Sequence, residues 1–239
     1  MFTKILISLL VLLPYALTAS ELVLKYDPSG SSTWIPYYIA ESEQPGIMGE
    51  LIPLVLARSK IKGKKIVLPA ARMNKALEGG VIDFDIISPS WIKPNERIGQ
   101  FVFSEDIMSI EEYTVKLASS TQHIPYKGNR VGTVRGYLYH DDDQYKRVDF
   151  SSEKNLVMAL STKRIKVAII GKLPAQYWAS QLGVEIKFQE LHSSGMLHIR
   201  LRSEFSHLLP QINAAITSVK ADGTIDNLVK KYTDGHIYH

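Results

Sequence analysis

Short apolar runs alternate along most of the chain with segments whose apolar residues recur at helical spacing. This alternation is typical of α/β proteins with mostly parallel strands. Pro53 would fall in the first turn of its helix, where proline is tolerated, and Gly79 and Gly80 would end the next helix. The first half is expected to run strand, helix, strand, helix, strand over 21–26, 50–59, 64–69, 71–78 and 81–88.

The second half repeats this alternation before it becomes helical. A Ser151 or Ser152 cap, with Glu153 in the first turn, is a favourable helix start. The segment 196–202 alternates apolar and polar residues, as a half-buried strand toward a sheet edge would. The expected elements are strands over 129–134, 166–170 and 184–190, helices over 152–162 and 174–182, and two C-terminal helices separated by 222–224.

Two extended segments, around 104–116 and 190–204, join these α/β units. Paired connections of this kind suggest a hinge, and a cleft between two lobes is a common place for a small ligand.

The first twenty residues predict a cleavable signal peptide. They carry one cation, Lys4, then an apolar run over 5–17 and small residues up to Ser20. The run is shorter than the roughly 20 residues that cross a bilayer, and Pro14 interrupts it. Cysteine is absent, which excludes disulfides, a thiolate metal site and a lipoprotein anchor. We therefore expect a periplasmic protein without a lipid anchor.

The charge balance does not favour nucleic acid as a partner. Lys and Arg number 28 against 24 Asp and Glu, for a formal net charge of +4. The densest basic stretch, 60–65, is expected to be a solvated loop.

Six motifs together resemble the bacterial family 3 extracytoplasmic solute-binding proteins, best known for polar amino acid uptake. They lie at 33–38, 46–51, 68–85, 95–107, 131–139 and 221–232. The resemblance implies a type II periplasmic-binding-protein fold of two lobes, each a mainly parallel sheet flanked by helices, joined by two crossover hinge strands. Lobe 1 would comprise 21–113 and 205–239, and lobe 2 would comprise 114–204. A monomer would close on its solute, and an inner-membrane permease would recognise the closed form.

The same resemblance implies a set of candidate solute contacts, most of which follow predicted strands. Arg97 would clasp a carboxylate, because a guanidinium matches it bidentately, although pairing with Glu96 or Asp106 explains this arginine too. Backbone N–H groups at 135–137 suit an anion, and aromatic residues suit a half-wet wall, although core packing explains the latter as well. The candidates are Trp34, Tyr37, Arg72, Ser88, Ser90, Trp91, Arg97, Arg135, Gly136 and Tyr137.

Two departures from the family pattern bear on the solute. Gly171 and Lys172 stand where amino-acid-binding members place an acid for the α-ammonium, and Tyr137 and Leu138 stand where hydroxyls are frequent. A buried ammonium without a carboxylate partner is costly. These departures favour a carboxylate-bearing or other anionic solute over a standard α-amino acid.

No catalytic motif of hydrolases, zinc proteases or P-loop enzymes is present, so we expect no enzyme and no cofactor. Asp141, Asp142 and Asp143, which follow His140, offer carboxylate ligands for a hard cation, but a solvated loop is the favoured interpretation and no metal is expected. His192, His198 and His207 lack ligand spacing. The expected function is delivery of a solute to a membrane importer. The alternatives are a sensory module for a membrane receptor and a small-acid dehydratase on the same scaffold.

Overall fold

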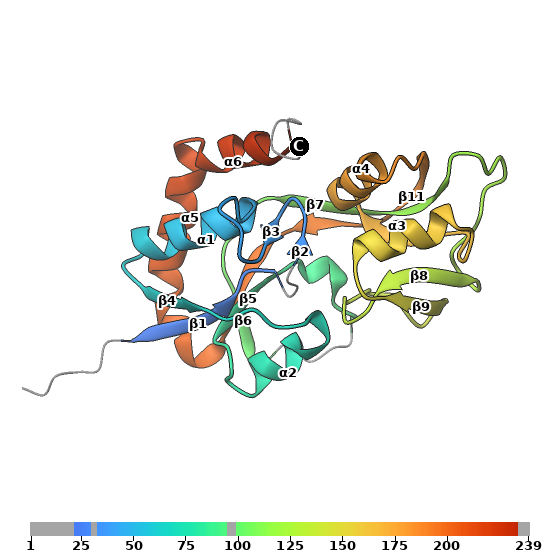
Figure 1. Cartoon of the computed structure of the whole chain (residues 1–239). Coiled ribbons are helices and arrows are strands. Elements are labelled where there is room, and N and C mark those ends of the chain that lie inside the picture. Colours follow the sequence, from blue (N-terminus) through green and yellow to red (C-terminus); the bar gives the residue numbers. More distant parts are fainter. Residues whose placement is uncertain (1–21, 30–32, 95–98, 234–239) are drawn as a thin grey trace, which may run out of the picture.

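A computed structural model of the chain describes residues 22–29, 33–94 and 99–233 and shows two lobes, each built on a five-stranded sheet (Figure 1). The predicted signal peptide, 1–20, lies outside the described residues. Among the residues that are described, no helix combines the length and the apolar character needed to cross a membrane.

The sheet of lobe 1 joins strands from both ends of the chain. β1 runs parallel to β4 and β5, whereas β12 runs antiparallel to β5 and β6. The strand order is β4 (Lys62–Lys65), β1 (Val23–Asp27), β5 (Phe84–Ile87), β12 (His198–Arg202) and β6 (Phe101–Phe103), and β2 (Thr33–Trp34) pairs with β3 (Tyr38–Ile39) beside it. β12 therefore lies one strand in from the edge.

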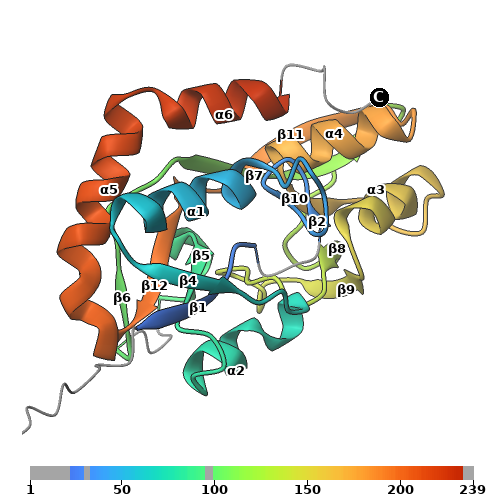
Figure 2. The same ribbon diagram turned by 60° about the vertical axis from the view of Figure 1, so that its left-hand side comes forward.

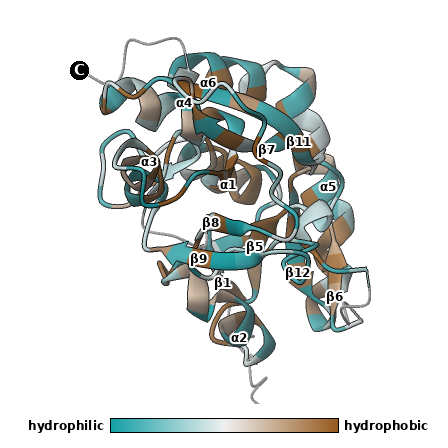
Figure 3. Ribbon diagram, turned by 90° about the vertical axis from the view of Figure 1, so that its right-hand side faces the viewer, coloured by the Kyte–Doolittle hydropathy of each residue, from teal (hydrophilic) through white to brown (hydrophobic). Residues whose placement is uncertain are grey.

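Three helices pack together on lobe 1: α1 (Ile47–Arg58), α5 (Leu209–Ala221) and α6 (Thr224–Thr233) (Figure 2). α1 is strongly apolar (Figure 3), and six of its residues are buried in the core. It begins three residues earlier than expected, so Pro53 lies inside the helix and not in its first turn. Shorter helical segments are η1 (Ala70–Arg72), α2 (Met73–Glu78), η2 (Pro89–Trp91) and η3 (Ser203–Leu208).

The sheet of lobe 2 also mixes parallel and antiparallel pairs. Its order is β11 (Ile186–Met196), β7 (Ser109–Leu117), β10 (Ala168–Gly171), β8 (Arg130–Val134) and β9 (Lys146–Phe150), with helices α3 (Glu153–Ser161) and α4 (Lys172–Gln181). The Oγ of Ser152 accepts from the N–H of Asn155 at 3.2 Å, which confirms the predicted cap of α3. β9 was not predicted, because its five residues do not alternate regularly between apolar and polar and none of them is fully buried.

The basic stretch 60–65 is not a loop, as was predicted, but contains the edge strand β4. The strand over 64–69 is correspondingly placed too late. All four residues of β4 are exposed, and lysines on an edge strand discourage pairing with another chain. The charge that suggested a loop is thus a property of the sheet edge.

Two chain segments connect the lobes, and they run side by side in opposite directions. The N–H of Ile107 donates to the carbonyl of Leu197 at 2.7 Å, and the N–H of Leu197 donates to the carbonyl of Met108 at 2.8 Å. The predicted lobe boundaries at 113/114 and 204/205 remain a prediction. The change of sheet comes a few residues earlier at each crossing, since β7 of the lobe 2 sheet begins at Ser109 and β12 of the lobe 1 sheet begins at His198.

Candidate solute-binding cleft

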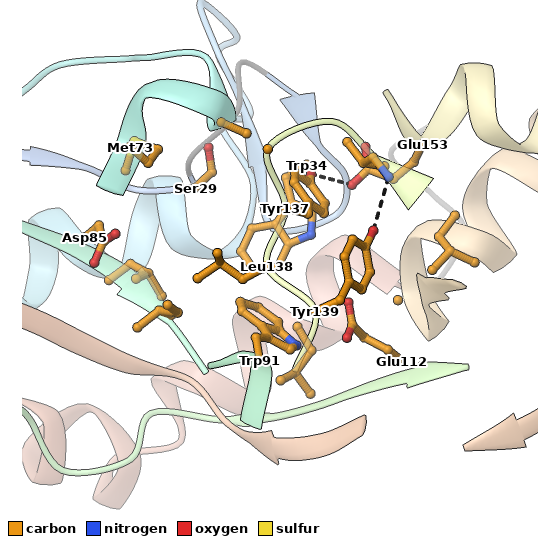
Figure 4. Close-up of a pocket in the computed structure, with 18 of the residues that line it drawn as sticks. Ser29, Trp34, Met73, Asp85, Trp91, Glu112, Tyr137, Leu138, Tyr139 and Glu153 are labelled. Atoms are coloured by element: carbon orange, nitrogen blue, oxygen red, sulfur yellow. Dashed lines mark hydrogen bonds between the residues drawn. The ribbon is translucent and has the colours of Figure 1, made fainter. Parts of the chain in front are cut away.

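A cavity of about 90 Å³ lies between the lobes (Figure 4). It opens at the carboxyl ends of β5, β8 and β10, where loops after parallel strands commonly bind ligands. Lobe 1 contributes Ser29, Trp34, Ala70, Met73, Asn74, Asp85, Ile86, Ile87, Trp91 and Arg200, and the remaining lining residues are Ile110, Glu112, Val134, Gly136, Tyr137, Leu138, Tyr139, Glu153, Ile169, Ile170 and Gly171.

A buried ion pair forms part of the lobe 1 wall. Arg200 on β12 lies opposite Asp85 on β5, and its Nε and Nη2 donate to the two carboxylate oxygens at 2.9 and 2.6 Å. Nη2 also donates to the Oδ1 of Asn74 at 2.9 Å. Within the described part of the chain, Nη1 of Arg200 makes no hydrogen bond. The pair is neutral as a whole, and Arg200 lines the cavity with this one guanidinium nitrogen not engaged by Asp85 or Asn74.

Aromatic rings complete the lobe 1 wall. The ring of Trp34 stacks on that of Tyr37 at a centroid distance of 4.2 Å and meets Trp91 edge-on at 6.2 Å. The Nε1 of Trp91 is buried and finds no acceptor among the residues described. A buried donor without a partner is costly, so a solute that accepts from Trp91 would relieve that cost.

Glu112 places a buried carboxylate on the lobe 2 side. It lies on β7 directly opposite Gly171 of β10, so both residues face the same side of the sheet. The Oγ of Ser193 donates to its Oε2 at 2.7 Å, and Nδ1 of His192 lies 3.7 Å from the same oxygen. Burial lowers the pKa of His192, but Glu112 and Asp141 outweigh that effect and raise it overall. These contacts hold the Glu112 carboxylate at the cavity.

Glu153 adds a second buried carboxyl group, at the first residue of α3. The hydroxyl of Tyr137 donates to its Oε1 at 2.6 Å, and Figure 4 shows this pair beside Tyr139. Burial raises the pKa of Glu153 to about 7, although the Tyr137 hydrogen bond and its own backbone N–H act against the rise. Near neutral pH this carboxyl group therefore holds its proton about half the time.

Replacing Glu153 by glutamine should change how stability depends on pH. The folded chain keeps this proton up to about pH 7, whereas the unfolded chain releases it near the ordinary value of 4.5, so the wild-type free energy of unfolding falls between those two values. The fall is about 3 kcal/mol at 1.36 kcal/mol per pKa unit. Glu153→Gln has no ionisable group at this position and should not show this decrease. The free energy of unfolding of the variant should therefore rise relative to that of wild type as pH increases, which urea denaturation at about pH 5 and about pH 8 measures.

The exposed Glu185 provides the control, since Glu185→Gln removes one carboxyl group that lies outside the cavity. A stability difference between Glu153→Gln and wild type that stays constant across this pH range would contradict the assignment.

The two lobes touch each other at two places. A Cβ atom on Gly136, whose φ is +86°, would lie 2.3 Å from the backbone nitrogen of Ala71 in lobe 1. Lys93 Nζ reaches the carboxylate of Asp142 across the cleft at 2.5 Å, and Arg147 binds the same carboxylate from within lobe 2 at 3.1 Å. The structure thus has the lobes in a closed arrangement.

Removing the interlobe ion pair should have a small effect. Lys93 is 47% exposed, and such pairs contribute about 0.2–1 kcal/mol. Lys93→Met should therefore weaken solute binding by at most about fivefold, and the difference should shrink with added salt. Titration calorimetry at low and high salt measures it. Lys172→Met, which breaks a pair with Glu111 inside lobe 2, should leave affinity unchanged; equal losses in both variants would rule out a contribution to closure.

Four of the ten predicted contacts line the cavity: Trp34, Trp91, Gly136 and Tyr137. Tyr37 lies buried behind Trp34, and Ser88 and Ser90 bond to each other at 2.8 Å next to Gly195 and are not among the residues that line the cavity. Two of the predicted arginine contacts do not reach the cavity: Arg72 is exposed on η1, and Arg135 lines a separate surface hollow with Phe150. Arg97 lies outside the described residues. The solute-binding role of all ten stays a prediction.

Sequence reasoning missed the charged residues of the cavity. Glu112 occupies the buried phase of its strand, with Ile110 and Thr114, and a glutamate in that phase is a usable signal. Asp85 carries a weaker one, as a charged residue within an apolar strand, whereas Arg200 falls in the polar phase of its alternating strand and carries none. Glu153 carries none, because an acid in the first turn of a helix is ordinary.

Comparison with known proteins agrees with this architecture. The model of the family described as bacterial extracellular solute-binding proteins, family 3, matches residues 30–235. A search of curated proteins finds no match.

Solved structures with the same fold include three with similar coverage. An arginine 3rd transport system periplasmic binding protein from Legionella pneumophila is 19% identical, with a TM-score of 0.70 over 89% of this chain and 100% of its own. A periplasmic His/Glu/Gln/Arg/opine family-binding protein from Silicibacter pomeroyi, in complex with lysine, is 18% identical (TM-score 0.72; 89% and 98%). The GluR0 ligand-binding core from Nostoc punctiforme, in complex with (L)-glutamate, is 19% identical (TM-score 0.73; 88% and 99%).

Proposed function

The chain belongs to the bacterial extracellular solute-binding proteins, family 3, and we propose that it captures a small polar solute between its lobes and delivers it to a membrane importer. The observation that carries the proposal is the cavity itself, which both lobes line and which charged groups enter from both sides. A solute held by both lobes stabilises the closed arrangement over an open one, because only the closed arrangement makes both sets of contacts.

The solute we propose is an amino acid. Its ammonium group would face the carboxylates of Glu112 and Glu153, and its carboxylate would accept from Nη1 of Arg200 and Nε1 of Trp91. The sequence has no acid at Gly171 or Lys172 to bind an α-ammonium group, which argued against an α-amino acid. Glu112 supports one after all, since it lies opposite Gly171 and offers a carboxylate at the same place on the sheet. Arg97 remains a second candidate for the carboxylate contact, on sequence grounds alone.

Export fits this proposal. The predicted leader over 1–20 would carry the chain to the periplasm, where an importer of the inner membrane would meet the closed form. The closed form buries the solute, so the importer would recognise the protein surface and not the solute. We propose that the protein acts without chemical change of its solute, as a binding protein.

The test is a screen of the mature protein against all common amino acids by thermal shift, followed by calorimetry on those that bind. At least one amino acid should raise the melting temperature, as expected for any ligand that binds only the folded state. Native mass spectrometry of the protein as purified would identify a retained solute. Failure of every amino acid, with a non-amino-acid solute retained, would overturn the solute class.

Whether the protein serves import or sensing is tested separately, by deleting the gene and measuring uptake of the solute that binds. Lost uptake supports import. Retained uptake, together with solute binding in vitro, would instead assign the protein to a sensory role at a membrane receptor.

A further inference from the structure

Three side chains behind the lobe 2 wall form a compact cluster that solute binding does not use: His140, Asp141 and His192. His140 and Asp141 belong to the segment after β8, and His192 belongs to β11, 51 residues further along the chain from Asp141. One ligand atom from each residue can be chosen so that all three lie within 4.8 Å of one another. Nε2 of His192 lies 2.8 Å from Oδ1 of Asp141, and Nε2 of His140 lies 3.9 Å from Oδ2.

Two ring nitrogens of this cluster have no hydrogen-bond partner among the described residues. The side chain of His192 is fully buried, and its Nδ1 atom has no hydrogen-bond partner among the residues that the structure describes. Nδ1 of His140 is also buried and is equally without a described partner. The two rings lie 4.8 Å apart at a tilt of 38°. Buried polar atoms are almost always partnered, so both rings are held in place with part of their hydrogen-bonding capacity unused, while their Nε2 atoms lie beside the Asp141 carboxylate.

The groups around the cluster are those that usually support a bound metal. Oε2 of Glu112 lies 3.7 Å from Nδ1 of His192, on the side of the ring away from Asp141. The hydroxyl of Tyr126 donates to Oδ2 of Asp141 at 2.9 Å. A metal-binding histidine commonly donates its other ring N–H to a carboxylate, and a metal-binding carboxylate is commonly held by a further hydrogen bond.

We propose that His140, Asp141 and His192 bind one divalent transition-metal ion of the Zn²⁺ class, each histidine through a ring nitrogen and Asp141 through its carboxylate. Two imidazoles and one carboxylate suit Zn²⁺ and its neighbours, whereas Ca²⁺ and Mg²⁺ require a larger set of oxygen ligands. Three protein ligands leave a position for water. The segments 140–143 and 190–193 would thereby be linked across lobe 2. The expectation that no metal binds is replaced by this proposal.

The test is a titration of the mature, tag-free protein with Zn²⁺ in competition with a chromogenic chelator. One ion per chain should bind. Co²⁺ in place of Zn²⁺ should give absorption bands typical of mixed nitrogen and oxygen ligands, which reports the ligand set directly. His140→Ala should weaken binding by at least about tenfold, and its partly exposed side chain makes it the variant least harmful to folding.

His123→Ala is the matched control, because His123 is an exposed histidine that pairs with Glu190 outside the cluster. It should bind Zn²⁺ as wild type does. Asp141→Asn, checked for folding by circular dichroism, tests the carboxylate. The proposal is overturned if the wild-type protein binds no stoichiometric Zn²⁺, or if folded His140→Ala and His123→Ala variants bind it equally. Neither outcome depends on whether an amino acid enters the cleft.

Discussion

Alanine at position 136 is expected to weaken solute binding by about a hundredfold while both lobes stay folded. The added Cβ would lie 2.3 Å from the backbone nitrogen and 2.6 Å from the Cα of Ala71. Backbone atoms cannot turn aside as a flexible side chain can, so the lobes must separate by a small distance. A solute in the separated form loses part of its contacts with one lobe, and apparent affinity falls with the population of the binding-competent state.

Gly128 supplies a closely matched control for this variant. Its φ is +72°, so alanine there meets the same backbone strain as at position 136, at about 1–2 kcal/mol, but no described atom beyond its two chain neighbours lies within 4 Å of the added Cβ. Gly128→Ala should therefore lose stability and keep affinity. Calorimetry measures the affinity, and small-angle scattering with saturating solute should show a larger radius of gyration only for Gly136→Ala. Equal affinities for the two variants would refute the role of Gly136 in closure.

Glu112→Gln should reduce affinity for an amino acid by a similar factor. A buried ammonium that loses its carboxylate partner costs about 2–5 kcal/mol, and about 2.7 kcal/mol corresponds to a hundredfold change. Glutamine keeps the shape and an acceptor for the Ser193 hydroxyl, so the variant tests charge and not packing. Calorimetry should show the loss for any solute bearing an ammonium group. A solute that lacks this group should bind the variant as well as it binds wild type, or more tightly.

The neighbouring residue separates this effect from a general change of charge. Glu111 lies on the same strand, but its carboxylate pairs with Lys172 and does not line the cavity. Glu111→Gln removes the same charge one residue away and should leave affinity within about twofold. If both variants lose affinity equally, the carboxylate of Glu112 does not contact the solute.

The elements of the fold were largely predictable because local pattern decides them. Apolar residues of α1 recur on one face, and the Ser152 side chain caps α3 as a serine before a helix is expected to do. Where prediction was wrong, a tertiary effect was responsible. Lysines at 62, 64 and 65 suit a loop in isolation, but at a sheet edge they suit the exposed strand β4 equally well.

The position of the acid in the cleft could not be predicted from the order of residues along the chain. Gly171 stands where an acid was expected, and along the chain nothing near it replaces that acid. In the sheet, antiparallel pairing puts Glu112 directly across from it, although the two residues are 59 positions apart. Sequence spacing contains no information about which strands pair or in which register. The strand register, and not sequence spacing, therefore supports the proposed amino acid solute.

Local sequence pattern was enough to predict most of the strands and helices, the aromatic and glycine residues that follow strands, and the resemblance to family 3, although it missed β9. These follow from local periodicity and turn chemistry, which act over a few residues. The three-dimensional fold was needed to show which charged groups share the cavity and that His192 meets Asp141 behind it. Those juxtapositions arise from strand order, register and lobe closure, because each joins residues that are distant along the chain.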